Sequence, residues 1–408
     1  MKLLALLALV PALALAAPPV DQKMVELWSR MDEFHAARGV KKPDKPRELK
    51  RVTPASGGAV TPAPGGGEIA KLVDAFMDAH PNTGLLVLKG DTVLAERYQY
   101  GRTAQNRFES ASVAKTVLGM LIGIAVSEGK IKSLDDKAEQ YVPELKGHPY
   151  GETSIRNLLT MSSGIAFTEA DLSTRSEGRR LIDNTVFQKT EGGVDAVKEF
   201  NRREAPAGTR FHYASGDSEV LGLVLAKATG RPVATYLSEK IWQPMGAEAN
   251  ATWLVDKGGY EATYCCLNAT LRDFARFGML LAHYGVLDGK QIIPAGWVKA
   301  ATTASAPHLA VGTATKYNGY GYQTWIIGDG RPRENSIRGG GSPAVSLVES
   351  TMFAAFGLRG QAIFVDGASK LVVVHTAVWP DGRDQDERGA QFELWFTLLA
   401  KTSQPRTL

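Results

Sequence analysis

A serine followed three residues later by a lysine is the first feature of the sequence that could support catalysis. Ser112 and Lys115 stand where the polar residues Glu109 and Ser110 give way to a long apolar run. An apolar run of this length predicts a fully buried helix, and residues three apart lie on one helix face. We therefore expect the Ser112 hydroxyl and the Lys115 amine to meet at the start of a buried helix.

A lysine in that position could act as the base that activates the serine. A free lysine has a pKa of about 10.4 and is protonated at neutral pH. Burial beside the positive end of a helix dipole can lower that pKa to about 7, where the amine can accept the serine proton. Backbone N–H groups at the same helix start could stabilise an oxyanion. The pair predicts nucleophilic catalysis. The alternative is that Ser112 only caps the helix and Lys115 extends to solvent.

Other familiar catalytic patterns are missing from the sequence. A second Ser-x-x-Lys, Ser127 to Lys130, lies at the exit of the same predicted helix beside Gly129 and is expected to be solvated. The sequence has no Gly-x-Ser-x-Gly elbow, phosphate-binding loop, Cys-x-x-Cys or His-Glu-x-x-His, so we expect no cofactor and no metal. Cys265 and Cys266 are adjacent, and neighbours in sequence rarely reach disulfide geometry. We interpret them as buried free thiols.

The composition is that of an ordinary globular protein. Its 408 residues include 47 Lys and Arg against 43 Asp and Glu, and 44% are apolar. This balance excludes a disordered, collagen-like or disulfide-stapled chain. Because the charge is nearly balanced, we expect no nucleic-acid partner.

The N-terminal part of the chain is expected to differ from the rest. Lys2 and the apolar stretch Leu3–Ala17 predict a signal peptide over residues 1–16, although a buried helix is an alternative. The mature protein would be exported, periplasmic or secreted, with no integral membrane segment. Residues 17–67 are predicted to form an extension that ends in a Pro/Gly-rich linker. Its basic run, Lys41–Arg51, predicts either a solvated linker or a weak attraction to an anionic envelope surface.

Hydrophobic periodicity predicts the elements of the main domain, residues 68–400. Both chain ends, 68–112 and 310–400, have strand pairs and flanking helices, whereas 113–309 is mostly helical. The predicted elements are a helix at Glu68–His80, a strand pair at Leu85–Leu88 and Val93–Tyr100, a second pair at Ala362–Val365 and Leu371–Val374, and a helix at Gln391–Ala400. We infer an α/β layer made from both ends with a helical domain inserted between them.

Several motifs in a fixed order carry a family resemblance. They are Phe108–Lys115, Leu134–Asp136, Ile155–Gly164, Phe211–Ser215, Leu271–Gly278 and Tyr320–Trp325. This set, which spans Lys71 to Ala400, resembles the serine β-lactamase-related hydrolases of the class C and 6-aminohexanoate-dimer hydrolase type. The resemblance implies an α/β (α+β) fold of the β-lactamase/D,D-peptidase kind. In that fold an antiparallel sheet is flanked by helices from both chain ends, with an inserted, mostly helical domain.

The same resemblance implies roles for individual residues. Ser112 would be the acylated nucleophile, Lys115 its base and Tyr213 a phenol that relays the proton to the leaving group. The family's second sequence motif, or second box, is Tyr-x-Asn, and here Ser215 replaces the asparagine. The Ser215 hydroxyl, on a shorter side chain than asparagine, would orient the substrate. Tyr320 and Trp325 would offer an apolar wall.

The third box departs further from the family pattern. In the family, this motif is Lys/His-x-Gly on the strand beside the site. We place it at Leu358–Gly360, so Leu358 stands where the family carries a cation and Gly360 is the last residue of the motif. The alternative placement is Arg338–Gly340. By resemblance, the N–H groups of Ser112 and Gln361 would form the oxyanion hole.

These observations predict an enzyme that hydrolyses a small-molecule ester or amide through an acyl-enzyme. The apolar Leu358 favours neutral substrates, because a substrate carboxylate would lose a charge-assisted hydrogen bond there. One alternative is a β-lactamase or D,D-peptidase acting on penicillins or peptidoglycan peptides. A second alternative is a non-catalytic scaffold of the same fold.

Overall fold

The computed structural model describes residues 18–52, 66–169, 175–328 and 351–403. The predicted signal peptide, the Pro/Gly-rich linker at 53–65 and the alternative third box at 338–340 lie outside these residues. Within the described part of the chain, none of the helices combines the length and the hydropathy that crossing a bilayer requires.

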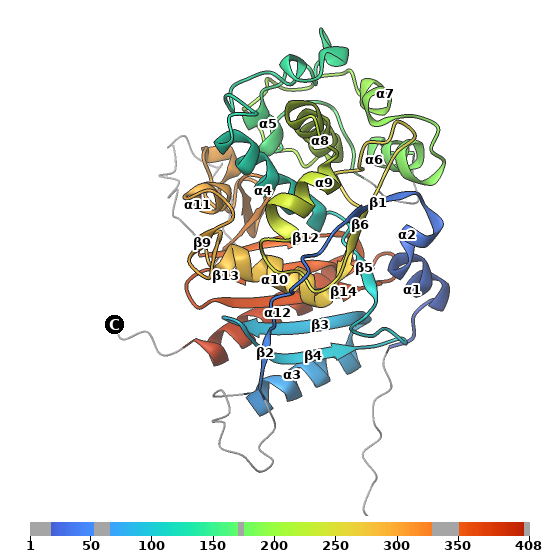
Figure 1. Ribbon diagram of the computed structural model, residues 1–408. Helices are drawn as coiled ribbons and strands as arrows, with labels where there is room; N and C mark the ends of the chain where they lie inside the picture. The colour runs from blue at the N-terminus through green and yellow to red at the C-terminus, as the bar shows by residue number, and fades with distance from the viewer. Residues whose placement is uncertain (1–17, 53–65, 170–174, 329–350, 404–408) are drawn as a thin grey trace, which may run out of the picture.

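An eight-stranded sheet forms the centre of the molecule and is built from both ends of the chain (Figure 1). In sheet order its strands are β10 (Asn318–Tyr320), β11 (Trp325–Ile327), β12 (Met352–Phe356), β13 (Ala362–Asp366), β14 (Leu371–Ala377), β3 (Asn82–Lys89), β4 (Thr92–Tyr98) and β2 (Lys50–Arg51). The pairing of β14 with β3 joins the C-terminal strands to the N-terminal ones. Neighbouring strands run antiparallel except β2, which runs parallel to β4.

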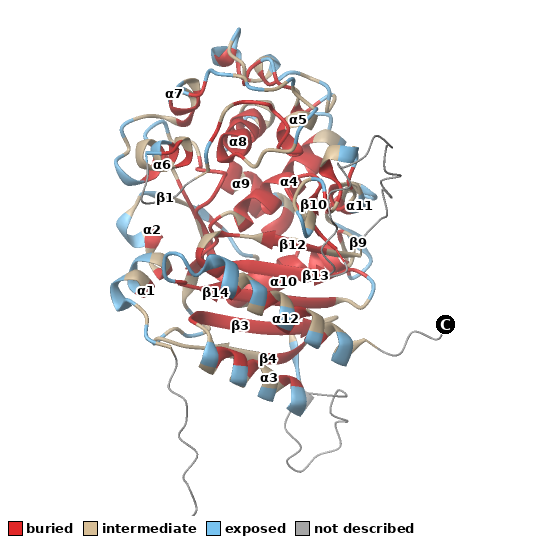
Figure 2. Ribbon diagram, turned by 180° about the vertical axis from the view of Figure 1, so that it is seen from behind, coloured by how far each residue is buried: buried red, intermediate tan, exposed pale blue. Residues whose placement is uncertain are grey.

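Helices cover both faces of this sheet. α3 (Gly66–Ala79) and α12 (Asp384–Thr402) lie on one face and turn their exposed sides to solvent (Figure 2), whereas α10 (Leu271–Ala282) packs against β13 and β14 on the other. Successive strand residues point to opposite faces. Leu85 and Val87 therefore pack with α3 and α12, and Leu86 and Leu88 pack into the larger core on the other side. Burial on both faces explains why β3 appears in the sequence as a continuous apolar run.

The inserted part of the chain is organised around two buried helices. α4 (Val113–Ser127) is buried from Val113 to Ala125 and packs on α8 (Ser215–Thr229). The shorter helices around them are α5 (Ile155–Leu159), α6 (Glu177–Ile182), α7 (Gly193–Lys198), α9 (Val233–Leu237) and α11 (Trp297–Ala301). The mixed helix and sheet architecture expected from the sequence is confirmed.

A smaller sheet connects the inserted part to the N-terminal residues. Its order is β1 (Ala37–Val40), β6 (Ala251–Leu254), β7 (Leu267–Thr270) and β5 (Arg107–Glu109). A two-stranded hairpin, β8 (Val286–Leu287) with β9 (Lys290–Gln291), lies after α10. Since β5 leads directly into α4, the smaller sheet fixes where that buried helix begins.

The described part of the predicted N-terminal extension is folded onto the domain. Residues 18–52 form α1 (Gln22–Ser29), α2 (Met31–Phe34), β1 and β2, all packed on the domain. Val25 is fully buried, and the Asp32 carboxylate accepts hydrogen bonds from Arg107 and Thr252. The helices are too short to show a clear hydrophobic period, and the strand pairs are too distant in sequence for a local pattern to reveal them.

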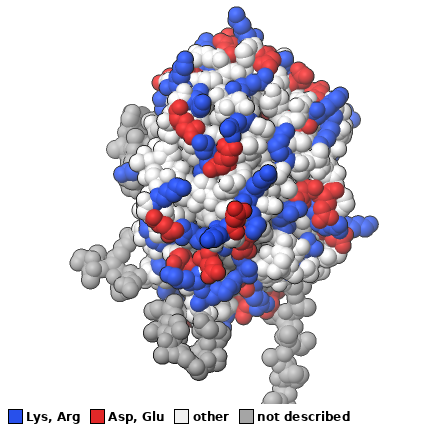
Figure 3. All heavy atoms as spheres, viewed as in Figure 1, with Lys and Arg blue, Asp and Glu red and all other residues white. Residues whose placement is uncertain are grey.

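The basic run Lys41–Arg51 is partly neutralised by carboxylates of the domain. Lys50 pairs with Asp91 at 2.8 Å, Arg51 pairs with Glu96 at 2.6 Å, and Arg47 pairs with Asp288. Basic and acidic side chains are mixed over the face shown in Figure 3. The run is therefore part of the folded surface, and not a solvated linker.

Candidate active site

The loop between β5 and α4 presents Ser112 at the start of the buried helix. Ala111 has a left-handed backbone conformation, with φ of 43°, and its N–H donates to the Glu109 carboxylate at 2.7 Å. A non-glycine residue in this region is strained and is typical of functional turns. Ser112 occupies the N-cap position, but its side chain makes no capping hydrogen bond. The alternative that Ser112 only caps the helix is therefore excluded.

Lys115 is buried and its amine is directed at Ser112. Its side chain is 1% exposed, and Nζ donates to Ser112 Oγ at 3.0 Å, Ser215 Oγ at 3.1 Å and the Tyr264 carbonyl at 2.7 Å. Burial lowers the pKa of Lys115 to about 8, although the carboxylates of Glu169, Glu109 and Glu219 oppose this shift. The alternative of a lysine extending to solvent is excluded, and a substantial fraction of this amine is neutral at mildly alkaline pH.

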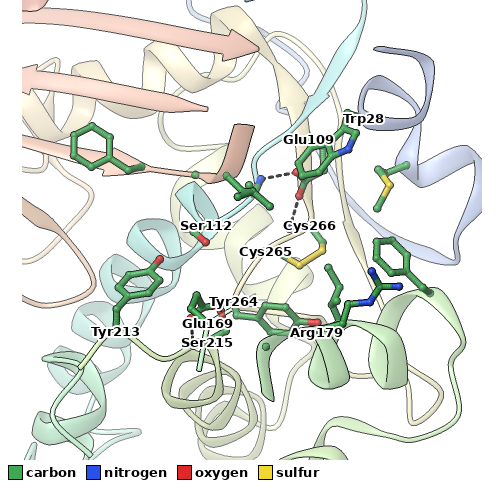
Figure 4. Close-up of a pocket in the computed structure, with 18 of the residues that line it drawn as sticks. Trp28, Glu109, Ser112, Glu169, Arg179, Tyr213, Ser215, Tyr264, Cys265 and Cys266 are labelled. Carbon is green, nitrogen blue, oxygen red and sulfur yellow. Dashed lines mark hydrogen bonds between the residues drawn. A yellow bond between two sulfur atoms is a disulfide. The ribbon is translucent and has the colours of Figure 1, made fainter. Parts of the chain in front are cut away.

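Tyr213 lies on the other side of the Ser112 hydroxyl. Figure 4 shows its phenol directed toward Ser112, and the Lys115 amine lies 5.1 Å from its ring centroid. The ring stacks on Trp325, with centroids 5.4 Å apart. Burial and the charge of Glu169 raise the pKa of Tyr213, and a hydrogen bond with the Ser112 side chain opposes that rise. The phenol therefore remains protonated at neutral pH and is able to donate.

The Ser112 and Tyr213 side chains line a cavity of about 420 Å³. Of the residues selected from the sequence, Ser112, Tyr213, Ser215, Trp325 and Leu358 line it. Tyr320 is buried behind Trp325, with ring centroids 4.9 Å apart, and supports the wall from outside the lining.

The third box does not lie on a strand as expected. β12 ends at Phe356, and Leu358–Gly360 form a short turn in which Arg359 and Gly360 have left-handed φ values of 57° and 96°. Phe356, Gly357 and Leu358 line the cavity, whereas Gly360 packs against Trp379. The side-chain amide of Gln361 donates to the Ala377 carbonyl at 2.7 Å, and Gln361 is outside the cavity lining.

The interpretation of the two cysteines as free thiols is wrong. Cys265 and Cys266 form a disulfide that lines the cavity (Figure 4). Cys266 adopts a left-handed backbone, with φ of 73°, a conformation that sequence analysis does not predict for a cysteine. The Glu109 carboxylate approaches both sulfurs, with the ligand atoms of all three residues within 4.8 Å of one another. Bridged sulfurs are not thiolates, so this group does not constitute a metal site in the oxidised protein.

Two carboxylates near the serine, the partly buried Glu169 and the buried Glu109, were not predicted from the sequence. Glu169 accepts hydrogen bonds from the N–H and the hydroxyl of Ser215, at 2.9 and 2.6 Å. Glu109 accepts from the Cys266 N–H at 2.8 Å, and burial raises its pKa to about 7. Glu109 lies three residues before Ser112, so its position beside the Ser-x-x-Lys motif could have indicated that it belongs to the site. Glu169 has no comparable local pattern.

The fold and the site together define a serine hydrolase of the Ser-x-x-Lys type. The chain belongs to the Beta-lactamase family, whose family model matches residues 69–393. It is 27% identical over 313 residues to the 6-aminohexanoate-dimer hydrolase of Paenarthrobacter ureafaciens, covering 75% of each chain.

The chain also resembles two solved structures. One is a Bacillus anthracis protein described as a candidate 6-aminohexanoate-dimer hydrolase, with a TM-score of 0.72, 25% identity and coverage of 93% of this chain and 95% of that one. The other is EstCE1, a hydrolase with promiscuous acyltransferase activity, with a TM-score of 0.60 and 15% identity. EstCE1 aligns with 80% of this chain and 98% of its own length, and at that identity it shows a shared fold. The suspected family is confirmed.

Proposed function

We propose that this hydrolase cleaves neutral esters or amides through an acyl-enzyme on Ser112. The observation that carries the proposal is the 3.0 Å contact between Lys115 Nζ and Ser112 Oγ in a buried, apolar setting that lowers the lysine pKa. A neutral amine at that distance can take the hydroxyl proton as Oγ attacks the substrate carbonyl carbon.

The remaining steps follow from the positions of the other groups. The negative charge on the carbonyl oxygen would be stabilised by the Ser112 N–H, which has no acceptor among the described residues, and by a second N–H from the segment Leu358–Gln361. Tyr213 would donate a proton to the departing oxygen or nitrogen as its bond to the carbonyl carbon breaks. Water would then attack the acyl-enzyme, with its proton returning through the same groups.

The proposal favours neutral substrates because of what lines the cavity. Leu358 is apolar, and Arg179 is held by Asp183 at 2.7 Å. A substrate carboxylate would find little compensation there for its lost hydration. The relative named 6-aminohexanoate-dimer hydrolase supports an amide bond as the target but not the preference for neutral substrates, because a 6-aminohexanoate dimer has a carboxylate, and EstCE1 supports acyl transfer. Penicillins and peptidoglycan peptides, which carry a carboxylate, are the alternative substrates.

We also propose that the protein is exported, on the basis of Lys2 and the apolar stretch Leu3–Ala17. Weak attraction to an anionic envelope surface would depend on Lys41, Lys42 and Lys45, which remain exposed. A periplasmic or secreted location is testable by fractionation of the native host.

Covalent labelling tests the proposal and separates it from a non-catalytic scaffold. A fluorophosphonate should label Ser112, identified by peptide mass, and Ser112→Ala should abolish both labelling and hydrolysis of p-nitrophenyl butyrate. Ser127 of the second Ser-x-x-Lys is the matched control, because its hydroxyl donates to the Ile124 carbonyl at the far end of the same helix. Ser127→Ala should keep turnover within about threefold. Labelling that persists in Ser112→Ala would contradict the assignment.

A further inference from the structure

The N-terminal segment contributes one wall of the active-site cavity. α1 and the start of α2 supply four apolar residues to the lining: Met24, Leu27, Trp28 and Met31. These residues precede the part of the chain that the family model matches, 69–393. The wall therefore comes from residues outside the region that the family model describes.

Other apolar groups line the cavity together with the N-terminal wall. They are Ile182 at the end of α6, Phe187 in the π-helical segment that follows, and the Cys265–Cys266 disulfide. The charged residues of this half are engaged with protein groups: Arg179 donates to Asp183, and Glu109 accepts from Cys266 N–H. This half of the cavity is therefore suited to an uncharged, apolar ligand group.

The apolar lining of the cavity continues to the protein surface. Leu27 and Phe187 each line the cavity and are nevertheless 38% exposed. Large apolar side chains that line a cavity and also remain in contact with water mark a place where an apolar ligand can be desolvated. The cavity can therefore admit an apolar chain that extends from Ser112 toward solvent.

The position of the wall relative to Tyr213 identifies which part of a substrate it would contact. In Figure 4, Tyr213 lies on one side of Ser112, and the disulfide, Arg179 and Trp28 lie on the other. The leaving group must be within reach of the phenol that protonates it. The acyl group is then directed to the side of Trp28.

We propose that the N-terminal wall is an acyl-binding subsite, and that the substrates carry a bulky apolar acyl group, either a medium-length alkyl chain or an aryl group. This inference rests on the proposed function. The Arg359 guanidinium lies 5.7 Å from the centroid of the Trp28 ring. Arg359 is itself fixed, because it donates to Asp381 and to the Trp379 carbonyl, so it holds the ring in place. A fixed ring loses little entropy when a chain packs on it.

Acyl-chain selectivity with a constant leaving group tests the subsite. The probes are p-nitrophenyl acetate, butyrate and octanoate, used with the full-length chain. The unmodified protein should show kcat/KM rising from acetate to octanoate. Trp28→Ala should lower kcat/KM for octanoate by about tenfold or more, the scale of apolar pocket contacts, and leave acetate within about twofold. Phe34→Ala is the matched control, because this exposed aromatic residue of α2 is not part of the lining.

Leu27→Gln tests the subsite independently of any folding defect in Trp28→Ala. Leu27 is partly exposed, so Leu27→Gln should fold normally and also reduce the ratio of octanoate to acetate. Equal losses for acetate and octanoate in both variants, or an unchanged ratio, would overturn the subsite while Ser112 labelling still stood. Failure of Ser112 labelling in the unmodified protein would instead contradict the proposed function.

Discussion

At the scale of single residues, the protonation of Lys115 is set by two opposing effects. Burial disfavours the ammonium form, while three carboxylates, Glu169, Glu109 and Glu219, favour it. Burial also raises the pKa of Glu109 to about 7 and that of Glu219 to about 8, so these acids are partly neutral when the lysine loses its proton. The balance leaves the Lys115 pKa at about 8, low enough for a base and high enough to return a proton.

The rate of hydrolysis should therefore follow the titration of Lys115. The amine is the active form and exists above its pKa, so kcat/KM for p-nitrophenyl butyrate should rise with pH and level off above about 8. Lys115→Arg should be inactive throughout, because a guanidinium stays protonated. Lys130→Arg, at an exposed lysine of the second motif, should leave the profile unchanged. A flat profile between about pH 6 and 9 would contradict a titrating lysine base.

Residues of the candidate site could be predicted from the sequence only where the pattern that indicates them lies within one short stretch of chain. Ser112 and Lys115 were predictable because their spacing and the following apolar run are both local, and the structure brings them together. The disulfide was missed because it depends on the left-handed backbone at Cys266, which no composition rule indicates. Glu169 was missed because its contact with Ser215 joins residues far apart in the chain.

At the scale of elements, the turn between β12 and β13 determines which residue of this segment lines the cavity. The apolar run Ala362–Val365 predicted β13, but β12 was not predicted, and the turn depends on the left-handed Arg359, which the sequence pattern did not reveal. Leu358 therefore stands at the cavity in a turn, and Arg359 points away to Asp381. The apolar character predicted for this position is retained even though the strand assignment was wrong.

Changing Leu358 should change substrate choice. The unmodified protein should hydrolyse p-nitrophenyl butyrate with higher kcat/KM than nitrocefin, whose carboxylate has no cation to meet at this position. Leu358→Lys should move the ratio toward nitrocefin by about tenfold or more, the value of one charge-assisted hydrogen bond. Leu358→Met, similar in size and uncharged, should leave the ratio near its original value. A ratio that the lysine does not move would show that position 358 does not contact the substrate carboxylate.

The loop that carries the disulfide also holds the Lys115 amine. Tyr264 precedes Cys265 and accepts the Lys115 hydrogen bond at 2.7 Å, while Cys266 N–H donates to Glu109. Denatured protein should bind no iodoacetamide before reduction and two carbamidomethyl groups after it, measured by intact mass. Reduction of the folded protein should lower kcat by a few-fold as the loop relaxes. The Cys265→Ser/Cys266→Ser double variant is the control, and its rate should not respond to reductant.

At the scale of the whole molecule, residues 18–52 connect the two sheets. β1 pairs with β6 in the smaller sheet and β2 pairs with β4 in the larger one, so one stretch of chain spans both. Between these strands, the buried Arg276 donates to the Arg47 carbonyl. The main domain could be predicted from periodicity, because its helices and hairpins are local patterns. The N-terminal connection could not, because its pairings join strands that are not neighbours in sequence: Ala37 in β1 pairs with Leu254 in β6, and Lys50 in β2 pairs with Thr92 in β4.

The Asp32 carboxylate attaches α2 to the smaller sheet. Its side chain is 3% exposed, and Oδ2 accepts from Arg107 Nε and Thr252 Oγ1, each at 2.7 Å. Asp32→Ala would leave both donors without their acceptor, which should lower the free energy of unfolding by about 1–3 kcal/mol in a urea titration. Asp44→Ala, at an exposed aspartate of the same segment, should change it by less than about 0.5 kcal/mol.

The same substitution should separate stability from catalysis. Because α1 would be held less firmly while Ser112 and Lys115 remain in the buried helix, Asp32→Ala should raise KM for p-nitrophenyl octanoate several-fold and leave kcat/KM for acetate nearly unchanged. Equal loss of activity toward both esters would mean that the N-terminal segment supports the catalytic groups themselves. Unchanged stability would mean that β1 and β2 hold the segment in place without Asp32.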